Sequence, residues 1–309
     1  MSWICEAHLI DGYFNTRCAP LLGEQVTTVT NPTDMHPSTG VRRSARLGAM
    51  NSLHRHWPEF LMEAGGVGLY LCVACLAATL LQHPASIVRR RVSSGLARRA
   101  MMGLAMGAAA FGIVMSPWGK RSGGHLNPAI TFAFYLLKKL ESWDARFYVV
   151  AQFLGSTIGV AVARYVLRGA LSDHSVDYAV TAPGVYGTTV AFMAELAISF
   201  FLMITILFAT NHKTFAPYAA HANGALLAMY YTFEAPLSGM STNPARTFGS
   251  AFHARYWHGL WIYFIAPPIG MMIAGEVFLR LRKGAVPFCA KLHHANNEIC
   301  IFHHSQQEV

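Results

Sequence analysis

Two identical tripeptides are the residues of this chain whose types and spacing could do chemistry: Asn127-Pro128-Ala129 and Asn243-Pro244-Ala245. Asparagine is a strong N-cap, because its side-chain oxygen accepts from the first free N–H groups of a helix. Proline fits the first helical position, where its missing N–H costs nothing. Each tripeptide therefore predicts a helix start that carries an amide, a hydrogen-bond donor, at its tip.

The segments that these tripeptides open are too short to cross a membrane. Leu126–Leu137 and Thr242–Phe252 have about half of the ~20 apolar residues that a lipid-spanning helix needs. Irregular backbone at membrane depth is tolerated only where protein buries it or where it lines a watery cavity. We therefore expect two half-helices beside a water-filled passage.

Six longer apolar segments are predicted to span the membrane: 58–82, 99–116, 146–167, 189–210, 216–236 and 257–279. Hydrophobic residues make up 53% of the 309 residues and the mean hydropathy is +0.33. Charged residues make up 13%, about half the usual share. This composition excludes a disordered chain, disfavours an ordinary soluble enzyme, and predicts an all-α membrane protein.

The net charge of +9 is explained by the flanks of membrane helices, so no nucleic-acid partner is expected. With the N-terminus inside, most Lys and Arg residues fall on the cytoplasmic side. The exceptions lie in the first outside loop: Arg89, Arg90, Arg91, Arg98 and Arg99. We expect a multi-pass protein of the inner cell membrane with both termini in the cytoplasm.

The chain contains an internal repeat. The second tripeptide follows the first by 116 residues, and Met62-Glu63-Ala64 is echoed by Ala194-Glu195-Leu196. Gly155 and Gly270 follow their respective asparagines by 28 and 27 residues. Three spans in each half are an odd number, so the second half must be inverted, and inverted repeats with broken helices place a solute site near the midplane.

Inversion brings the two helix starts together at the bilayer centre. Each start carries about half a positive charge from the helix dipole. A water oxygen held by both asparagine amides cannot also accept from the next water, so a proton wire is interrupted. The positive helix ends repel cations and hydronium, and the pattern predicts a passage for neutral solutes.

This architecture resembles the aquaporin, or major intrinsic protein, family, including its bacterial members. The resemblance rests on Ser122–Ala129, Ser241–Arg246, Glu63, Glu195 and Gln152. It implies a homotetramer with one pore per subunit that conducts water passively, without a cofactor or catalysis. It covers a channel domain at 57–282 (halves 57–168 and 189–282), between a polar, irregular, mobile N-terminal extension at 1–56 and a cytoplasmic tail at 283–309.

The resemblance also implies a selectivity filter. Arg246 corresponds to the arginine of the pore constriction, and counting back from Asn243 places Tyr231 and Met240 at two further filter positions. The filter residue on the second predicted span depends on the length of the 117–122 connection. It is Met102 if that connection carries an insertion, and Gly107 otherwise.

Two membrane-embedded acids have alternative roles. The resemblance implies that Glu63 and Glu195 accept hydrogen bonds from loop N–H groups and hold the half-helices, with His125 and Gln152 as further loop supports. A proton relay is the alternative, and Glu234, near Tyr231, would then belong to it. His125 is also a candidate gate.

The six cysteines are too few and too scattered for a disulfide scaffold. Cys289, His293, His294 and Cys300 follow the last span, together with His303 and His304. They are weak candidate ligands for a tetrahedral metal ion, and a solvated tail with incidental histidines is the alternative. No metal site is therefore predicted here.

The function expected from the whole pattern is a passive channel for water and other small neutral solutes that excludes protons and ions. Thr247, Ala251 and Tyr263-Phe264 favour water over glycerol, by comparison with the family. The alternatives are a channel for glycerol, ammonia, peroxide or metalloid acids, and an ion- or proton-coupled transporter.

Overall fold

The computed structural model describes residues 3–10, 13–20, 37–294 and 296–304, with side chains from Leu47 onward. The chain divides into two units, Met1–Arg46 and Leu47–Val309. In the first unit, strands β1 (Trp3–Ile10) and β2 (Tyr13–Pro20) pair antiparallel, with Ile10 opposite Tyr13. Asp-Gly at 11–12 is a sequence signal for such a hairpin.

Helix α1 (Pro37–Gln82) begins well before the predicted start at residue 58, and continues through Pro58. The expectation of an irregular segment up to residue 56 is therefore wrong for the strands and for the start of α1. The cause is a missed pattern: the first residues contain strand formers on both sides of Asp-Gly, and Pro58, where the predicted span begins, lies inside α1 instead of at its start.

Within the described residues, five helices are long and apolar enough to cross a membrane. They are α1 from Leu47, α3 (Gly95–Met115), α6 (Ser142–Leu167), α7 (Gly187–Thr210) and α11 (Leu260–Leu281). The segment predicted at 216–236 is divided into η3 (Ala216–Tyr218), α8 (Ala219–Phe233) and α9 (Ala235–Ser238). Pro217 and Pro236 lie at its two breaks, where proline ends or starts a helix.

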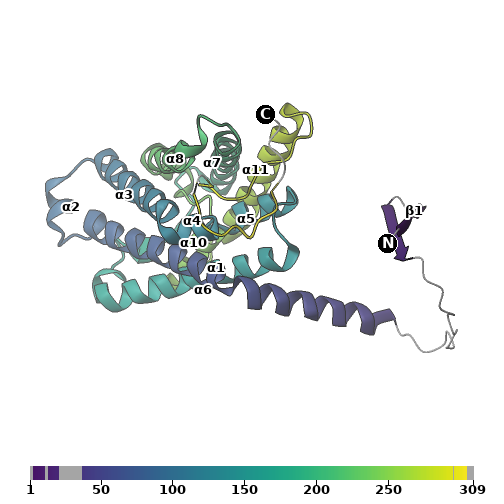
Figure 1. Cartoon of the computed structure of the whole chain (residues 1–309). Helices are drawn as coiled ribbons and strands as arrows, with labels where there is room; N and C mark the ends of the chain where they lie inside the picture. Colours follow the sequence, from purple (N-terminus) through teal and green to yellow (C-terminus); the bar gives the residue numbers. More distant parts are fainter. Residues whose placement is uncertain (1–2, 11–12, 21–36, 295, 305–309) are drawn as a thin grey trace. The chain divides into compact units, whose positions relative to one another are not determined.

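The shorter elements connect these helices. They are α2 (Ile87–Arg91), α4 (Pro117–Ser122), α5 (Pro128–Leu136), η1 (Arg168–Ala170), η2 (Asp177–Ala179) and α10 (Pro244–Ala254). Helix α3 packs along α8 and α7 along α11 (Figure 1). Each half-helix packs against a long helix of the opposite half, α5 against α11 and α10 against α6.

Two related glycines let the long helices approach closely. A Cβ on Gly155 would lie 2.1 Å from the carbonyl oxygen of Ala64, and one on Gly270 would lie 2.4 Å from that of Leu196. Ala64 and Leu196 directly follow Glu63 and Glu195. The repeated glycines therefore allow α6 and α11 to pack beside the two embedded glutamates, as small residues do in membrane helix pairs.

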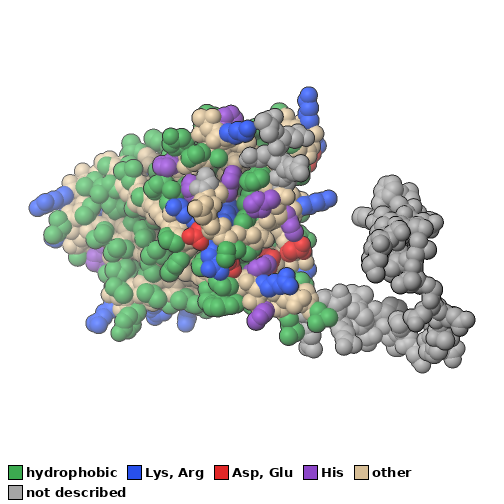
Figure 2. All heavy atoms as spheres, in the orientation of Figure 1, with side chains coloured by type: hydrophobic (Ala, Val, Ile, Leu, Met, Phe, Trp, Pro, Cys, Tyr) green, Lys and Arg blue, Asp and Glu red, His purple; other side chains and the backbone are tan. Residues whose placement is uncertain are grey.

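The surface of the 47–304 unit fits a membrane environment. Figure 2 shows hydrophobic side chains over much of the visible face, above all on its left and centre, whereas Lys, Arg and His side chains are more frequent on its right side. The large exposed side chains include Leu104, Ile158, Phe201 and Phe233. Exposed apolar area of this extent is unusual for a soluble monomer and suits contact with lipid or with another subunit.

Candidate solute pathway

Both tripeptides start helices, as their residue types require. The side-chain oxygen of Asn127 accepts from Ala129 N–H at 2.9 Å, and Pro128 is the first residue of α5. The side-chain oxygen of Asn243 accepts from Ala245 and Arg246 N–H at 3.0 and 3.2 Å, and Pro244 begins α10. Asn127 and Asn243 are therefore the N-cap residues of the half-helices in the first and second halves.

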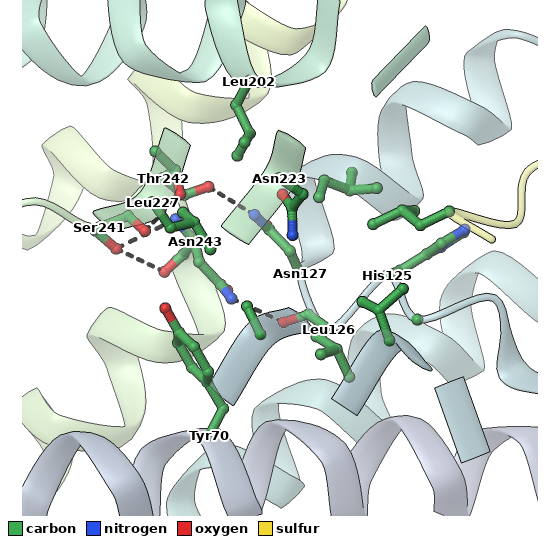
Figure 3. Close-up of a pocket in the computed structure, with 15 residues that line it drawn as sticks. Tyr70, His125, Leu126, Asn127, Leu202, Asn223, Leu227, Ser241, Thr242 and Asn243 are labelled. Atoms are coloured by element: carbon green, nitrogen blue, oxygen red, sulfur yellow. Dashed lines mark hydrogen bonds between the residues drawn. The ribbon is translucent and has the colours of Figure 1, made fainter. Parts of the chain in front are cut away.

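The two helix starts meet and exchange hydrogen bonds. Asn127 Nδ2 donates to the carbonyl oxygen of Thr242 at 2.8 Å, and Asn243 Nδ2 donates to that of Leu126 at 2.7 Å (Figure 3). Leu126 and Thr242 both have positive φ, 52° and 55°, a conformation that costs energy outside glycine. Each asparagine thus fixes a strained carbonyl of the opposite half.

The embedded glutamates hold the two loops. Glu63 accepts from the N–H groups of His125 and Leu126 at 3.1 and 2.6 Å, from Ser122 Oγ at 2.8 Å and from Gln152 Nε2 at 2.8 Å. Buried acceptors with this number of donors are held in a fixed orientation.

The second half reproduces the arrangement with fewer donors. Glu195 accepts from the N–H groups of Ser241 and Thr242 at 2.6 and 2.8 Å, and from Ser238 Oγ at 2.9 Å. In each loop these bonds satisfy donors that have no water to bond to at membrane depth.

A pair of tyrosines, whose supporting role the sequence reasoning missed, supports the same loops from α6 and α11. The hydroxyl of Tyr148 donates to the carbonyl of Ser122 at 2.6 Å, and the hydroxyl of Tyr263 donates to that of Ser238. A repeat comparison could have found them, since each lies at a similar distance after its own tripeptide. His125 is buried and its Nδ1 pairs with Thr131 Oγ1 at 3.1 Å.

A narrow cavity lies where the two halves meet. The space open to the centre of a water molecule is about 40 Å³, room for a few waters in file. Polar groups come from both loops, from Asn223 of α8 and from Tyr70 of α1, and most of the other lining side chains are apolar (Figure 3). The lining comprises Tyr70, Ala110, Val114, Gly124, His125, Leu126, Asn127, Ile130, Leu202, Asn223, Leu227, Ser241, Thr242, Asn243 and Leu292.

Most of the residues that line this cavity outside the two loops were not named from the sequence, among them Tyr70, Asn223 and Leu292. Tyr70 comes from α1, Asn223 from α8 and Leu292 from the segment after α11. An isolated amide in an apolar helix was a usable signal for Asn223, since polar side chains at membrane depth are expensive unless they face water. Nothing in the sequence indicated that Leu292 returns to the passage.

Arg246 lies one turn into α10 and is 3% exposed. Its Nε and Nη1 groups have no hydrogen-bond partner among the described residues. Its electrostatic neighbours include Tyr231, Tyr70 and Cys75. The guanidinium therefore presents free donors in a buried setting beside two tyrosines, which is an arrangement able to bind a polar neutral molecule.

The remaining filter candidates, Met240, Met102 and Gly107, differ from one another in burial and in the elements that they contact. Met240 is fully buried in the loop before Asn243, and Met102 is half-buried against the core. Gly107 contacts α8, where a Cβ would lie 2.4 Å from the carbonyl oxygen of Gly224. The structure therefore uses Gly107 to bring α3 and α8 together.

Glu234 is the C-cap of α8 and is buried close to Glu195.

The candidate metal ligands separate into two groups. Cys289 Sγ lies 3.5 Å from Cys300 Sγ and 3.9 Å from His304 Nε2, and the three ligand atoms all lie within 4.8 Å of one another. His293 and His294 are outside this cluster. Burial lowers the pKa of His293 and of His294, which favours their neutral forms.

Comparison with known proteins identifies the family of this fold. The model of the family described as "Major intrinsic protein" matches residues 50–278, about three quarters of the chain. The chain belongs to the major intrinsic protein family. The doubled tripeptide, the paired half-helices and the two loop-holding glutamates all lie inside the matched region.

Similar members of the major intrinsic protein family come from plants and animals. Nodulin-26 of Glycine max is 36% identical over 162 residues, 52% of this chain and 58% of its own. Aquaporin-4 of Rattus norvegicus is 34% identical over 175 residues, 52% of this chain and 50% of its own. The chain therefore spans little more than half the length of the curated relatives it matches.

A solved structure shares the fold of this family member. The aquaglyceroporin of Plasmodium falciparum superposes with a TM-score of 0.62 at 20% identity, over 72% of this chain and 95% of that chain. At this identity the likeness shows the fold alone. The predicted class, an all-α membrane protein with an aquaporin-like architecture, is confirmed.

Proposed function

We propose that the chain is a passive transmembrane channel for water and other small neutral solutes. The observation that carries the proposal is the meeting of the two half-helix starts, where Asn127 and Asn243 line a cavity wide enough for a few waters. One N–H of each amide is donated to a carbonyl, so the other remains for a passing water. No covalent step is required.

Selection against ions follows from the charges in the passage. Two helix N-termini place partial positive charge at the junction, and Arg246 adds a full charge with two donors that have no partner in the described part of the chain. A cation would lose hydration without gaining an opposite charge, whereas a water molecule accepts from these donors. The proposed filter consists of Arg246 and Tyr231, with Met240 and Met102 as further candidates.

The experiment is stopped-flow light scattering on proteoliposomes, comparing osmotic water efflux with glycerol entry. We expect fast water flux and little glycerol entry in the wild type, and increased glycerol and cation entry in Arg246→Ala. Arg280→Ala is the matched control, because this arginine is exposed and pairs with Glu276 at the surface. Water flux no faster than in empty liposomes would contradict the proposal, and a clear preference for glycerol would favour the alternative channel.

We further propose a homotetramer with a channel domain at 57–282 and both termini in the cytoplasm of an inner cell membrane. The exposed apolar side chains and the excess of Lys and Arg around the termini support this arrangement. Native mass spectrometry would test the assembly. Labelling of Cys300 in oriented vesicles by a membrane-impermeant maleimide would test the side on which the tail lies.

A further inference from the structure

The segment after α11 returns to the passage instead of leaving the protein. Leu292 N–H donates to the carbonyl of Gly123 at 3.0 Å, and the carbonyl of Ala290 pairs with His125 Nε2 at 2.9 Å. Phe302 stacks on the His125 ring with centroids 5.4 Å apart. The tail, defined here as residues 283–294 and 296–304, is therefore bonded to the loop that carries the first asparagine.

This position places an apolar side chain in the cavity. Leu292 is 2% exposed and lines the same space as Asn127 and Asn243. In Figure 3 the tail ribbon passes beside His125, at the edge of the labelled cavity. The free space of about 40 Å³ is what remains beside Leu292, so this side chain forms part of the wall that limits the passage. Displacement of the tail would remove Leu292 from the cavity wall and widen the passage at this point.

The two arms of the tail meet at a cluster of soft ligands. The Cys289 and Cys300 sulfurs are 3.5 Å apart, and His304 Nε2 is 3.9 Å from the Cys289 sulfur. In a tetrahedral site with Zn–S of 2.3 Å, two sulfurs lie about 3.8 Å apart and a sulfur and a nitrogen about 3.6 Å apart. These two spacings need shifts of only a few tenths of an ångström, and the Cys300 sulfur lies within 4.8 Å of His304 Nε2.

The donor set indicates the class of ion. Two thiols and one imidazole suit Zn²⁺ or another thiophilic ion, whereas Ca²⁺ and Mg²⁺ require oxygen ligands. Cys289 is buried, Cys300 is half-buried and His304 is exposed, so the cluster lies at the protein surface within reach of solvent. Three protein ligands leave a fourth position for water or a neighbouring side chain.

We propose that Cys289, Cys300 and His304 bind a zinc-like divalent ion, and that this ion fixes the tail in the mouth and closes the channel. The metal joins the chain on both sides of Leu292, between residues 289 and 300. It therefore stabilises the tail conformation in which Leu292 lines and narrows the cavity, by mass action on the closed state. The closure half of this proposal rests on the proposed channel function, and the metal site does not.

The metal site is tested by equilibrium dialysis of the full-length purified protein against Zn²⁺, followed by elemental analysis. We expect one Zn²⁺ per chain, and at least a tenfold weaker affinity in Cys289→Ser/Cys300→Ser. Matched controls are Cys72→Ser/Cys75→Ser, whose thiols lie in α1, and His303→Ala, beside the cluster. Equal binding by wild type and Cys289→Ser/Cys300→Ser, or no binding by wild type, would overturn the site.

Closure is tested by water flux through the same proteins with Zn²⁺ or with a chelator. We expect Zn²⁺ to lower wild-type flux several-fold, and to have little effect on Leu292→Ala and on Cys289→Ser/Cys300→Ser. Stoichiometric Zn²⁺ binding without a change in flux would overturn closure but keep the site. If neither chelated wild type nor Leu292→Ala conducts water or glycerol, the proposed channel function and closure both fail, and dialysis still decides the site.

Discussion

The side-chain amide of Asn127 donates to the backbone carbonyl of Thr242, a residue of the opposite half of the repeat, at 2.8 Å. Its counterpart is the bond from Asn243 to Leu126 at 2.7 Å. Each asparagine therefore caps its own half-helix and fixes the loop of the other half. The two tripeptides form one structural unit, although 116 residues separate them.

Replacing Asn127 with Asp separates these two roles. Asp is as good an N-cap as Asn, so α5 should still start at Pro128. The donor to Thr242 is lost, and a carboxylate faces that carbonyl instead. We expect several-fold lower water flux and a loss of stability of about 1–3 kcal/mol, from the unsatisfied carbonyl. Flux and thermal unfolding measured together would check this, and an unchanged flux would contradict the donor role.

Replacing Glu63 with Gln tests support against proton relay. Gln offers one acceptor oxygen and places an N–H₂ against donors that now bond to the carboxylate, such as Leu126 N–H and Gln152 Nε2. We expect a loss of stability of about 2–4 kcal/mol, since buried donors are left unsatisfied. Exposed Glu276→Gln is the control. A variant of normal stability whose flux alone loses a dependence on the pH gradient would indicate a relay.

Replacing Gly155 with Val is expected to disrupt the contact between α6 and α1. The new Cβ would lie 2.1 Å from the carbonyl oxygen of Ala64, and backbone must move to relieve this. We expect a markedly lower unfolding temperature and lost flux, with the same result for Gly270→Val beside Leu196.

Gly112→Ala is the control for these glycine variants. It lies inside α3, and no atom lies within 4 Å of a Cβ added there. Alanine in a helix interior should stabilise by about 0.5–1 kcal/mol. Equal destabilisation of all three variants would contradict the close-packing argument.

Replacing Asn223 with Leu is expected to lower water flux several-fold while leaving stability nearly unchanged. Asn223 is a polar residue of α8 in the cavity wall, and Leu has a similar size without a donor or acceptor. A water passing an apolar wall loses a hydrogen bond that nothing else replaces. Wild-type flux in this variant, in the same stopped-flow assay, would show that the loops alone support the water file.

The sequence by itself determined the membrane class, the inverted repeat and the two helix starts. Each depends on local chemistry: apolar length, the capping preference of asparagine and the fit of proline at the first helical position. Glu63 and Glu195 were recognisable because burying an acid at membrane depth costs free energy, so such a residue usually has a structural or functional role. The hairpin before residue 21 was also encoded locally, by Asp-Gly, and was overlooked.

Tertiary structure decided what depends on the approach of distant segments. The sequence around Gly107 does not show whether this residue faces the passage or packs against Gly224. The rotation of α3 about its axis decides which of the two it does. The supports from Tyr148 and Tyr263 likewise required the helices to be placed. The position of Leu292 in the cavity wall arises because the tail folds back onto residues more than 150 positions earlier, and the meeting of Cys289, Cys300 and His304 depends on how the tail itself is folded.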